Sequence, residues 1–194
     1  MAKKSDKVFG PGLGSASRVA IGIDQSYSGF GITFMNMDSG AYKTVVFKAE
    51  STGVDRLINV SVKLGDLLDT YVPSNAKEVV VAMEGYAFGT QMAHMAGELG
   101  ATVKLLLVDY LHKHHGKYPY IIPPTVLKKY VTGKGSGIQK NQMLLHVFKK
   151  WNVEFNDDNA ADSYALAHLA AGKADLAYER EIYHNIQDPK YREK

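Results

Sequence analysis

The sequence predicts a layered α/β domain with a mixed central sheet of about five strands flanked by helices. Short apolar runs that stop at turn residues alternate with longer segments in which apolar residues recur at helical spacing. One run, residues 78–83, is almost continuously apolar, which is typical of a strand buried on both faces. With 194 residues, 45% of them hydrophobic, the chain is long enough to bury a sizeable core.

The expected strands are the short apolar runs, at residues 18–24, 30–35, 42–49, 78–83 and 118–122. The turn residues Asp38-Ser-Gly40 favour a hairpin between the second strand and the third. Helices are expected where the apolar period lengthens, at residues 55–71, about 90–114, 124–130, 139–151 and about 158–171. Pro124 suits the first turn of the third helix, and either Asp157 or Asp158 could cap the last one.

Both ends of the chain differ in composition from the predicted domain, which spans residues 18–171. Residues 1–17 are basic and then rich in glycine, proline and serine, which predicts a flexible basic arm. Residues 172–194 form a charged tail, either helical or loose.

Composition excludes several classes of function. The chain has no cysteine, so disulfides, thiolate metal sites and cysteine nucleophiles are excluded. No apolar run is long enough to span a bilayer, and the charged N-terminus does not resemble a secretory signal. We therefore expect a cytoplasmic protein with no membrane partner. The net charge of +3 is only mildly basic and does not by itself indicate nucleic-acid binding.

Carboxylates occur where charged side chains are costly to bury. Asp24 closes an apolar strand, and Glu84 closes the most apolar strand of the chain. A charge beside a buried strand must be paired, hydrated or bound to a metal. A third acidic group begins a helix, where Asp158 and Asp162 are four residues apart and Asn159 shares nearly the same face.

Each acid alone has an ordinary structural interpretation as a turn residue, a salt-bridge partner, an N-cap or a first-turn acid. Together, acids from two strand ends and one helix start favour a site for Mg²⁺, which prefers oxygen ligands. Two such ions, about 3.5–4 Å apart, can activate a water and stabilise the leaving oxygen in phosphodiester hydrolysis.

Four motifs, taken in order, resemble those of RuvC-like Holliday junction resolvases. They are Ile21-Gly-Ile-Asp24, Val81-Ala-Met-Glu84, the block from Pro123 to Lys140, and Asp158-Asn-Ala-Ala-Asp162. The resemblance covers about residues 18–171 and implies an RNase H-like fold and nuclease domain. It further implies a homodimeric crossover junction endodeoxyribonuclease that nicks four-way DNA symmetrically with Mg²⁺ or Mn²⁺. The variant Glu84-Gly-Tyr-Ala-Phe-Gly89 looks more like bacteriophage-encoded members, which would act in the host cytoplasm.

The resemblance also implies roles for single residues. Asp24, Glu84 and Asp162 match the family's metal-binding acids. Relatives carry a fourth acid three residues before the last one, where this chain has Asn159. Asp158 is then the natural substitute and completes the predicted catalytic set; Asn159 and Asp157 are further candidates. Lys140 matches a lysine near the scissile phosphate, where it would hold DNA or stabilise developing negative charge.

Further DNA contacts are expected from basic and aromatic side chains. The candidates are Lys128, Lys129, Lys134 and Lys140 for the phosphates, and Tyr86 and Phe88 for stacking on unpaired bases. Packing in the core is an equally good interpretation of the two aromatic residues. The long helix from Thr90 is the expected dimer interface.

Three other functions stay open at this point. The same nuclease machinery could cut flaps, forks or other branched substrates, since such choices depend on shape. A similar fold could bind branched DNA without cutting it. The loop after Ile21-Gly-Ile-Asp24 also resembles the first phosphate loop of sugar kinases and actin-type ATPases. One domain of this length is too short for that two-domain phosphotransferase architecture, so no nucleotide cofactor is expected.

Overall fold

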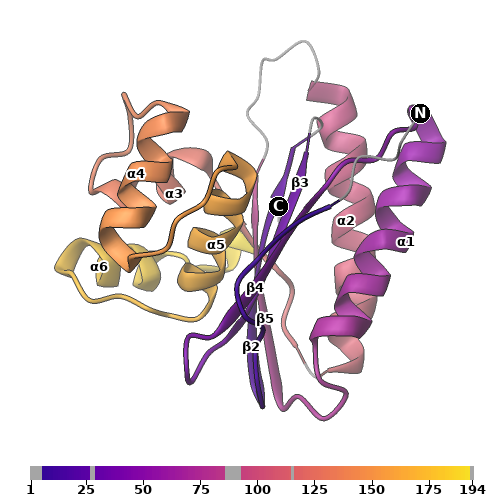
Figure 1. Cartoon of the computed structure of the whole chain (residues 1–194), viewed down its shortest axis with the longest axis horizontal. Helices are drawn as coiled ribbons and strands as arrows, with labels where there is room; N and C mark the ends of the chain where they lie inside the picture. The colour runs from indigo at the N-terminus through magenta and orange to yellow at the C-terminus, as the bar shows by residue number, and fades with distance from the viewer. Residues whose placement is uncertain (1–5, 27–28, 86–92, 115, 193–194) are drawn as a thin grey trace.

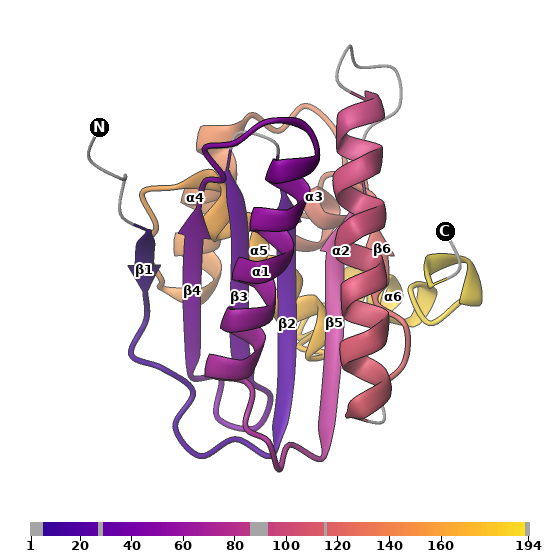
Figure 2. The same cartoon turned by 90° about the vertical axis from the view of Figure 1, so that its right-hand side faces the viewer.

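The computed structural model describes residues 6–26, 29–85, 93–114 and 116–192, apart from the side chains of residues 140 and 141. Its centre is one sheet with helices on both faces (Figure 1). Across the sheet the strands follow the order β1-β4-β3-β2-β5-β6 (Figure 2). Their bounds are Lys7–Phe9 for β1, Arg18–Gln25 for β2, Phe30–Asn36 for β3, Tyr42–Phe47 for β4, Glu78–Glu84 for β5 and Tyr120–Ile122 for β6.

The sheet is mixed, as the sequence predicts. Strands β2, β3 and β4 form an antiparallel meander, whereas β5 pairs in parallel with β2 and with β6. The sheet has six strands in the described residues rather than the expected five or so, because β1 adds an antiparallel partner to β4.

The segment that supplies β1 was predicted to be a flexible arm, and its described part contradicts that prediction. Lys7 pairs with Val46 of β4, and Leu13 and Ala16 are buried in the core. The side-chain amide of Asn36 donates to the carbonyls of Leu13 and Ser15, at 3.1 Å in each case. The physical reason is that β4 would otherwise present an unpaired strand edge, which the arm covers.

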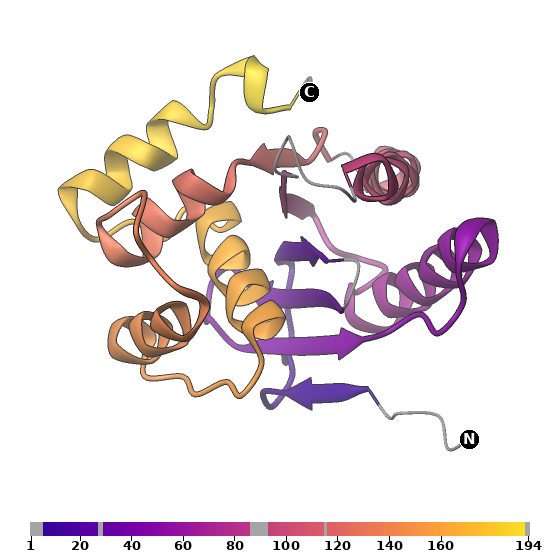
Figure 3. The same ribbon diagram turned by 90° about the horizontal axis from the view of Figure 1, so that it is seen from above.

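Two helices cover one face of the sheet and four lie on the other side (Figures 1 and 3). The first pair is α1 (Gly53–Tyr71) and α2 (Ala93–Lys113). On the other side α5 (Asp158–Ala170) packs directly on the sheet. Outside it lie α3 (Pro124–Thr132), α4 (Lys140–Trp151) and α6 (Ala177–Asn185), followed by the short 3₁₀ turn Pro189–Tyr191. None of the helices in these described segments is long and apolar enough to cross a membrane.

The C-terminal segment is packed rather than loose. Glu179 of α6 is buried and its carboxylate lies 2.8 Å from the ammonium of Lys150 on α4. The same carboxylate accepts hydrogen bonds from the backbone N–H groups of Asp175 and Leu176, which stabilises the start of α6. The charges of this segment therefore serve in part to attach α6 to the layer that covers α5.

Candidate active site

Asp24 and Glu84 lie side by side at the carboxyl ends of two neighbouring parallel strands. Ile23 of β2 is in register with Met83 of β5, so the next residue of each strand is one of the two acids. The side-chain amide of Gln25 donates to the backbone carbonyl of Glu84 at 3.0 Å and fixes the two strand ends to each other. Such strand ends are where α/β folds place ligand sites.

Helix α5 brings the third acid, Asp162, to the same place because it packs unusually close to the sheet. A Cβ on Gly22 would lie 2.0 Å from the carbonyl oxygen of Ser163 and 2.3 Å from the amide nitrogen of Ala167. A Cβ on Gly31 would lie 2.3 Å from the carbonyl oxygen of Asn159. These two glycines therefore permit backbone-to-backbone packing that no larger residue allows.

A buried hydroxyl chain fixes the helix in that position. The hydroxyl of Thr33 on β3 lies 3.0 Å from the hydroxyl of Ser163 on α5 and 2.7 Å from that of Thr44 on β4. Ser163 also donates to the carbonyl of Ala160, at 3.0 Å. All of these hydroxyl groups have hydrogen-bond partners within the core. The hydrogen bonds therefore fix the position and rotation of α5 on the sheet, and with them the position of Asp162.

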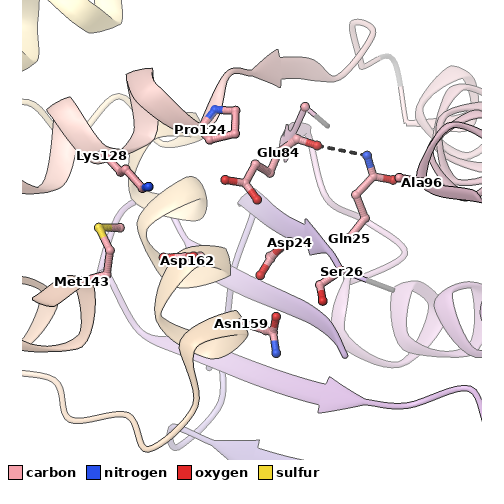
Figure 4. Close-up of a pocket in the computed structure, with 11 residues that line it drawn as sticks. Asp24, Gln25, Ser26, Glu84, Ala96, Pro124, Lys128, Met143, Asn159 and Asp162 are labelled. Carbon is pink, nitrogen blue, oxygen red and sulfur yellow. Dashed lines mark hydrogen bonds between the residues drawn. The ribbon is translucent and has the colours of Figure 1, made fainter. Parts of the chain in front are cut away.

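The acids line a cavity of about 270 Å³ (Figure 4). In that view the side chains of Glu84 and Lys128 point toward each other across the cavity. Its lining comes from both strand ends and from four helices: Asp24, Gln25, Ser26, Glu84, Gly85, Ala96, Pro124, Lys128, Met143, Asn159 and Asp162.

Negative charge dominates the surroundings of Asp24. Burial, then the charges of Glu84 and Asp162, a hydrogen bond with Glu84 and the charge of Asp158 all raise the pKa of Asp24 well above its ordinary value. A cation bound beside Asp24 would offset this repulsion. The donor set consists of oxygens, which fits a hard divalent cation such as Mg²⁺ or Mn²⁺.

The site is not a preformed ion cage. Within the described residues, no three histidine, cysteine, aspartate or glutamate side chains are grouped closely enough to hold a metal ion as they stand. The side chains of Asp24 and Glu84 instead contact each other through a hydrogen bond.

The three candidate ligands at the start of α5, Asp157, Asp158 and Asn159, lie in three different environments. Asp157 is the N-cap: its carboxylate accepts from the backbone N–H of Asn159 at 3.0 Å and from the ammonium of Lys7 at 2.7 Å. Asn159 lines the cavity. Asp158, the substitute favoured from the sequence, does not line the cavity, although its charge contributes to the raised pKa of Asp24.

The predicted DNA contacts are only partly described. Lys128 of α3 lines the acid cavity, Lys129 is half-buried on the same helix, and Lys134 is exposed on the loop that follows. Lys140 begins α4, but its side chain lies outside the description. Tyr86 and Phe88 also lie outside the described residues, as does Thr90.

The glycine-rich loop carrying Lys134 is engaged with its own chain. The backbone N–H of Lys134 donates to the hydroxyl of Thr132 at 3.0 Å, and that hydroxyl is also 3.0 Å from the Lys134 carbonyl. Gly133 adopts a left-handed conformation, φ 77°, and ends α3. The backbone N–H of Lys134 is therefore already paired within the chain, whereas its side chain is exposed.

Sequence reasoning missed Gln25 and Met143 as lining residues of the site, and it missed Lys7 as the partner of Asp157. Gln25 directly follows the strand-end acid, and that position was a signal for a residue that joins β2 to β5. Met143 resembled an ordinary core residue of an amphipathic helix. Lys7 had no signal at all, because only the pairing of β1 with β4 brings it to Asp157.

The sequence matches no protein-family model. No curated protein shows significant similarity to the chain either.

Among solved structures, the fold resembles that of RuvC from Thermus thermophilus. One structure of that protein has a TM-score of 0.57 at 18% identity, covering 90% of this chain and 97% of the other. A second, RuvC in complex with a Holliday junction substrate, has a TM-score of 0.58 at 16% identity, covering 89% and 96%. The yeast mitochondrial Holliday junction resolvase Ydc2 superposes less well, with a TM-score of 0.49 at 17% identity, covering 94% and 84%. The chain thus has the RNase H-like α/β fold of RuvC.

Proposed function

We propose that this protein is a metal-dependent endonuclease that cuts branched DNA, with four-way Holliday junctions as its substrate. The observation that carries the proposal is the meeting of Asp24, Glu84 and Asp162 in one cavity, where burial and neighbouring negative charge raise the pKa of Asp24. The resemblance of the fold to a RuvC solved with a Holliday junction supports the choice of substrate. The acids of the site all lie within residues 18–171, the proposed nuclease domain.

In this proposal Asp24, Glu84 and Asp162 hold one or two Mg²⁺ or Mn²⁺ ions, and Asp158 or Asn159 completes the oxygen set. Bound ions of this kind lower the pKa of a water and neutralise charge on a phosphoryl group. A cation held there would offset the charges of Glu84, Asp162 and Asp158 and would favour the ionised, ligating form of Asp24. Gln25 keeps the strand ends that carry Asp24 and Glu84 at a constant separation.

Lysines hold the DNA strand relative to these acids. Lys128 lines the cavity, which supports a contact between its ammonium and the phosphate nearest to the acids. Lys140 begins the neighbouring helix and is proposed to stabilise the charge that develops at that phosphate. Lys129 and Lys134 follow the backbone further away, and Tyr86 or Phe88 stacks on an unpaired base. Symmetric nicks on two strands require two sites, so we propose a homodimer.

The direct test is cleavage of a labelled synthetic four-way junction in Mg²⁺ by the wild-type chain, beside a matched duplex. We expect paired, symmetric nicks in the junction and none in the duplex. Asp24→Asn removes one ligand at nearly constant shape, and we expect its cleavage to fall to background. Asp66→Asn, on the exposed surface of α1, is the matched control and keeps wild-type cleavage.

Other outcomes would change the proposal in defined ways. Equal cutting of junctions, forks and flaps would keep the nuclease and replace the resolvase with a debranching enzyme. Junction binding without any cut in Mg²⁺ or Mn²⁺ would leave a non-cleaving DNA-binding protein. Full cleavage by Asp24→Asn would show that the acid cavity is not the active site.

A further inference from the structure

Resting on the proposed function, we propose that Lys7 and Asp157 are positioning residues for Asn159. They hold its side chain so that the amide oxygen faces the acid cavity and serves as the fourth oxygen donor to the cation. In this arrangement the short strand β1, outside the predicted domain, becomes part of the metal site.

The first step is the set of hydrogen bonds around the Asp157 carboxylate. One oxygen, Oδ2, lies 2.7 Å from the ammonium of Lys7. The other, Oδ1, accepts from the backbone N–H of Asn159 at 3.0 Å and from its side-chain Nδ2 at 3.1 Å. The Asp157 carboxylate therefore links the ammonium of Lys7 on β1 to the backbone N–H and the side-chain amide of Asn159 on α5.

The second step is the direction of the Asn159 amide. A carboxylate can only accept, so the group of Asn159 that faces Asp157 must be the NH₂ group. The amide oxygen then points the opposite way, and Figure 4 shows it directed toward Asp24 and Ser26 at the cavity wall. Gly29 leaves room for this rotamer, because a Cβ there would lie 2.9 Å from Nδ2.

The third step explains why an amide fits at this position. An aspartate at 159 would place a second carboxylate oxygen near Asp157 Oδ1, at the position where Nδ2 now donates at 3.1 Å. Two acceptors at that distance repel each other. The pair Asp157–Asn159 is therefore complementary, and the amide supplies an oxygen ligand without adding a fourth negative charge beside Asp24.

The fourth step concerns Lys7, which β1 delivers to Asp157. Lys7 pairs with Val46 of β4, and it lies 150 residues away from Asp157 in sequence. Its side chain is about half exposed, whereas that of Asp157 is 12% exposed. The ion pair fixes which carboxylate oxygen is left for Asn159. Second partners of metal ligands act in this way, by orienting the ligand.

The test measures Mn²⁺ binding to the purified full-length chain by calorimetry, without DNA. Asp157→Ala frees the Asn159 amide, and we expect about tenfold weaker Mn²⁺ binding. Lys7→Met removes only the ion pair, and we expect binding about threefold weaker, in line with an exposed ion pair. Asp157→Asn keeps the acceptor oxygen and loses the same ion pair, so it should match Lys7→Met.

The matched control breaks another ion pair of the same arm, from the side of α1. Lys63→Met removes the 2.7 Å ion pair between Lys63 and Asp6, which also attaches the arm but does not contact Asp157. We expect wild-type Mn²⁺ binding from this variant. Thermal denaturation of all variants separates loss of the N-cap, which lowers the melting temperature, from loss of a ligand, which lowers Mn²⁺ affinity in the folded protein.

Three results would overturn this inference alone. One is wild-type affinity in folded Asp157→Ala and Lys7→Met; another is equal weakening by the Lys63→Met control. The third is wild-type affinity in Asn159→Ala together with weak binding by Asp158→Asn, which would assign the fourth donor to Asp158. Absence of Mn²⁺ binding by the wild type would overturn both this inference and the metal-dependent function. If the wild type binds Mn²⁺ and the variants weaken binding as expected, but no DNA is cleaved, only the proposed nuclease activity would be overturned.

Discussion

The two faces of the sheet are packed by different means. On the face covered by α1 and α2, bulky aliphatic side chains fill the space, and Leu64, Leu68, Leu107 and Leu111 are fully buried. On the other face α5 presents mostly small residues, and glycines of the strands meet its backbone directly. The first face resembles an ordinary helix–sheet interface, whereas on the second the backbone of α5 lies directly against the strand backbone at Gly22 and Gly31.

This difference separates stability from the geometry of the site. Side chains on the α1 and α2 face can repack, because neither helix carries a candidate ligand. Helix α2 contributes only Ala96 to the wall of the cavity. Asp162, in contrast, reaches Asp24 only because α5 lies against the backbone of β2 and β3. We therefore expect substitutions of similar size to have very different consequences on the two faces.

The largest expected effect is from Gly22→Ala on the α5 face. The added methyl would lie 2.0 Å and 2.3 Å from backbone atoms of α5, so the helix must move away from the sheet. We expect a loss of at least about 3 kcal/mol in the free energy of unfolding, at the upper end for overpacking. Urea denaturation measures it. A fully stable Gly22→Ala protein would show that α5 is not held at this distance.

A similar contrast is expected between ion pairs on the two sides of the sheet. Glu179→Ala leaves the ammonium of Lys150, which is 17% exposed, without its buried partner 2.8 Å away. Breaking a buried pair in this way costs about 3 kcal/mol or more. Asp109→Ala breaks the pair with Lys113 on α2, where both side chains are more than two-thirds exposed. We expect less than about 0.5 kcal/mol for that exposed helix pair. Equal losses in urea denaturation would contradict the contrast.

The layer outside α5 should also make stability depend on pH. Burial, and then the charges of Lys150 and Lys173, lower the pKa of His168 to about 3 from 6.5, against an opposing effect of Glu179. Between these two values the unfolded chain binds a proton that the folded chain does not, so stability falls as pH drops from 6.5 toward 3.

His168→Phe tests this dependence and keeps an aromatic ring against Trp151, whose ring lies 4.4 Å from that of His168. We expect the free energy of unfolding to decline less steeply between pH 6.5 and pH 4 in this variant than in the wild type. Other acids titrate equally in both proteins, so the difference between the two curves isolates His168. Parallel curves would show that His168 is protonated in the folded state.

The sequence predicted the arrangement of strands and helices well because hydrophobic periodicity reports burial directly. The three acids at the cavity could be selected for the same reason: Asp24 and Glu84 end apolar strands, and Asp162 lies near the start of a buried helix. Parallel pairing of β2 with β5 then brings the first two together, and this pairing follows from the order of elements.

The N-terminal arm could not be predicted, because its composition resembles a linker and its partner lies far away in sequence. Lys7, Leu13 and Ala16 gain their environment only when β4 offers a free edge. Which of Asp157, Asp158 and Asn159 is the fourth metal ligand could not be predicted from the sequence either. Successive residues at a helix start point in different directions, and which one enters a cavity depends on the rotation of α5 against the sheet.

The smallest expected effect comes from Gly65→Ala, in the middle of α1. A Cβ at this position has no neighbour within 4 Å, in contrast to Gly22. Alanine has a higher helix propensity than glycine, so we expect the free energy of unfolding to rise by about 0.5–1 kcal/mol. Thermal denaturation would show a higher melting temperature, with Mn²⁺ binding unchanged. A destabilised Gly65→Ala protein would mean that the exposed side of α1 is covered in solution, which would point to α1 as part of the proposed dimer interface.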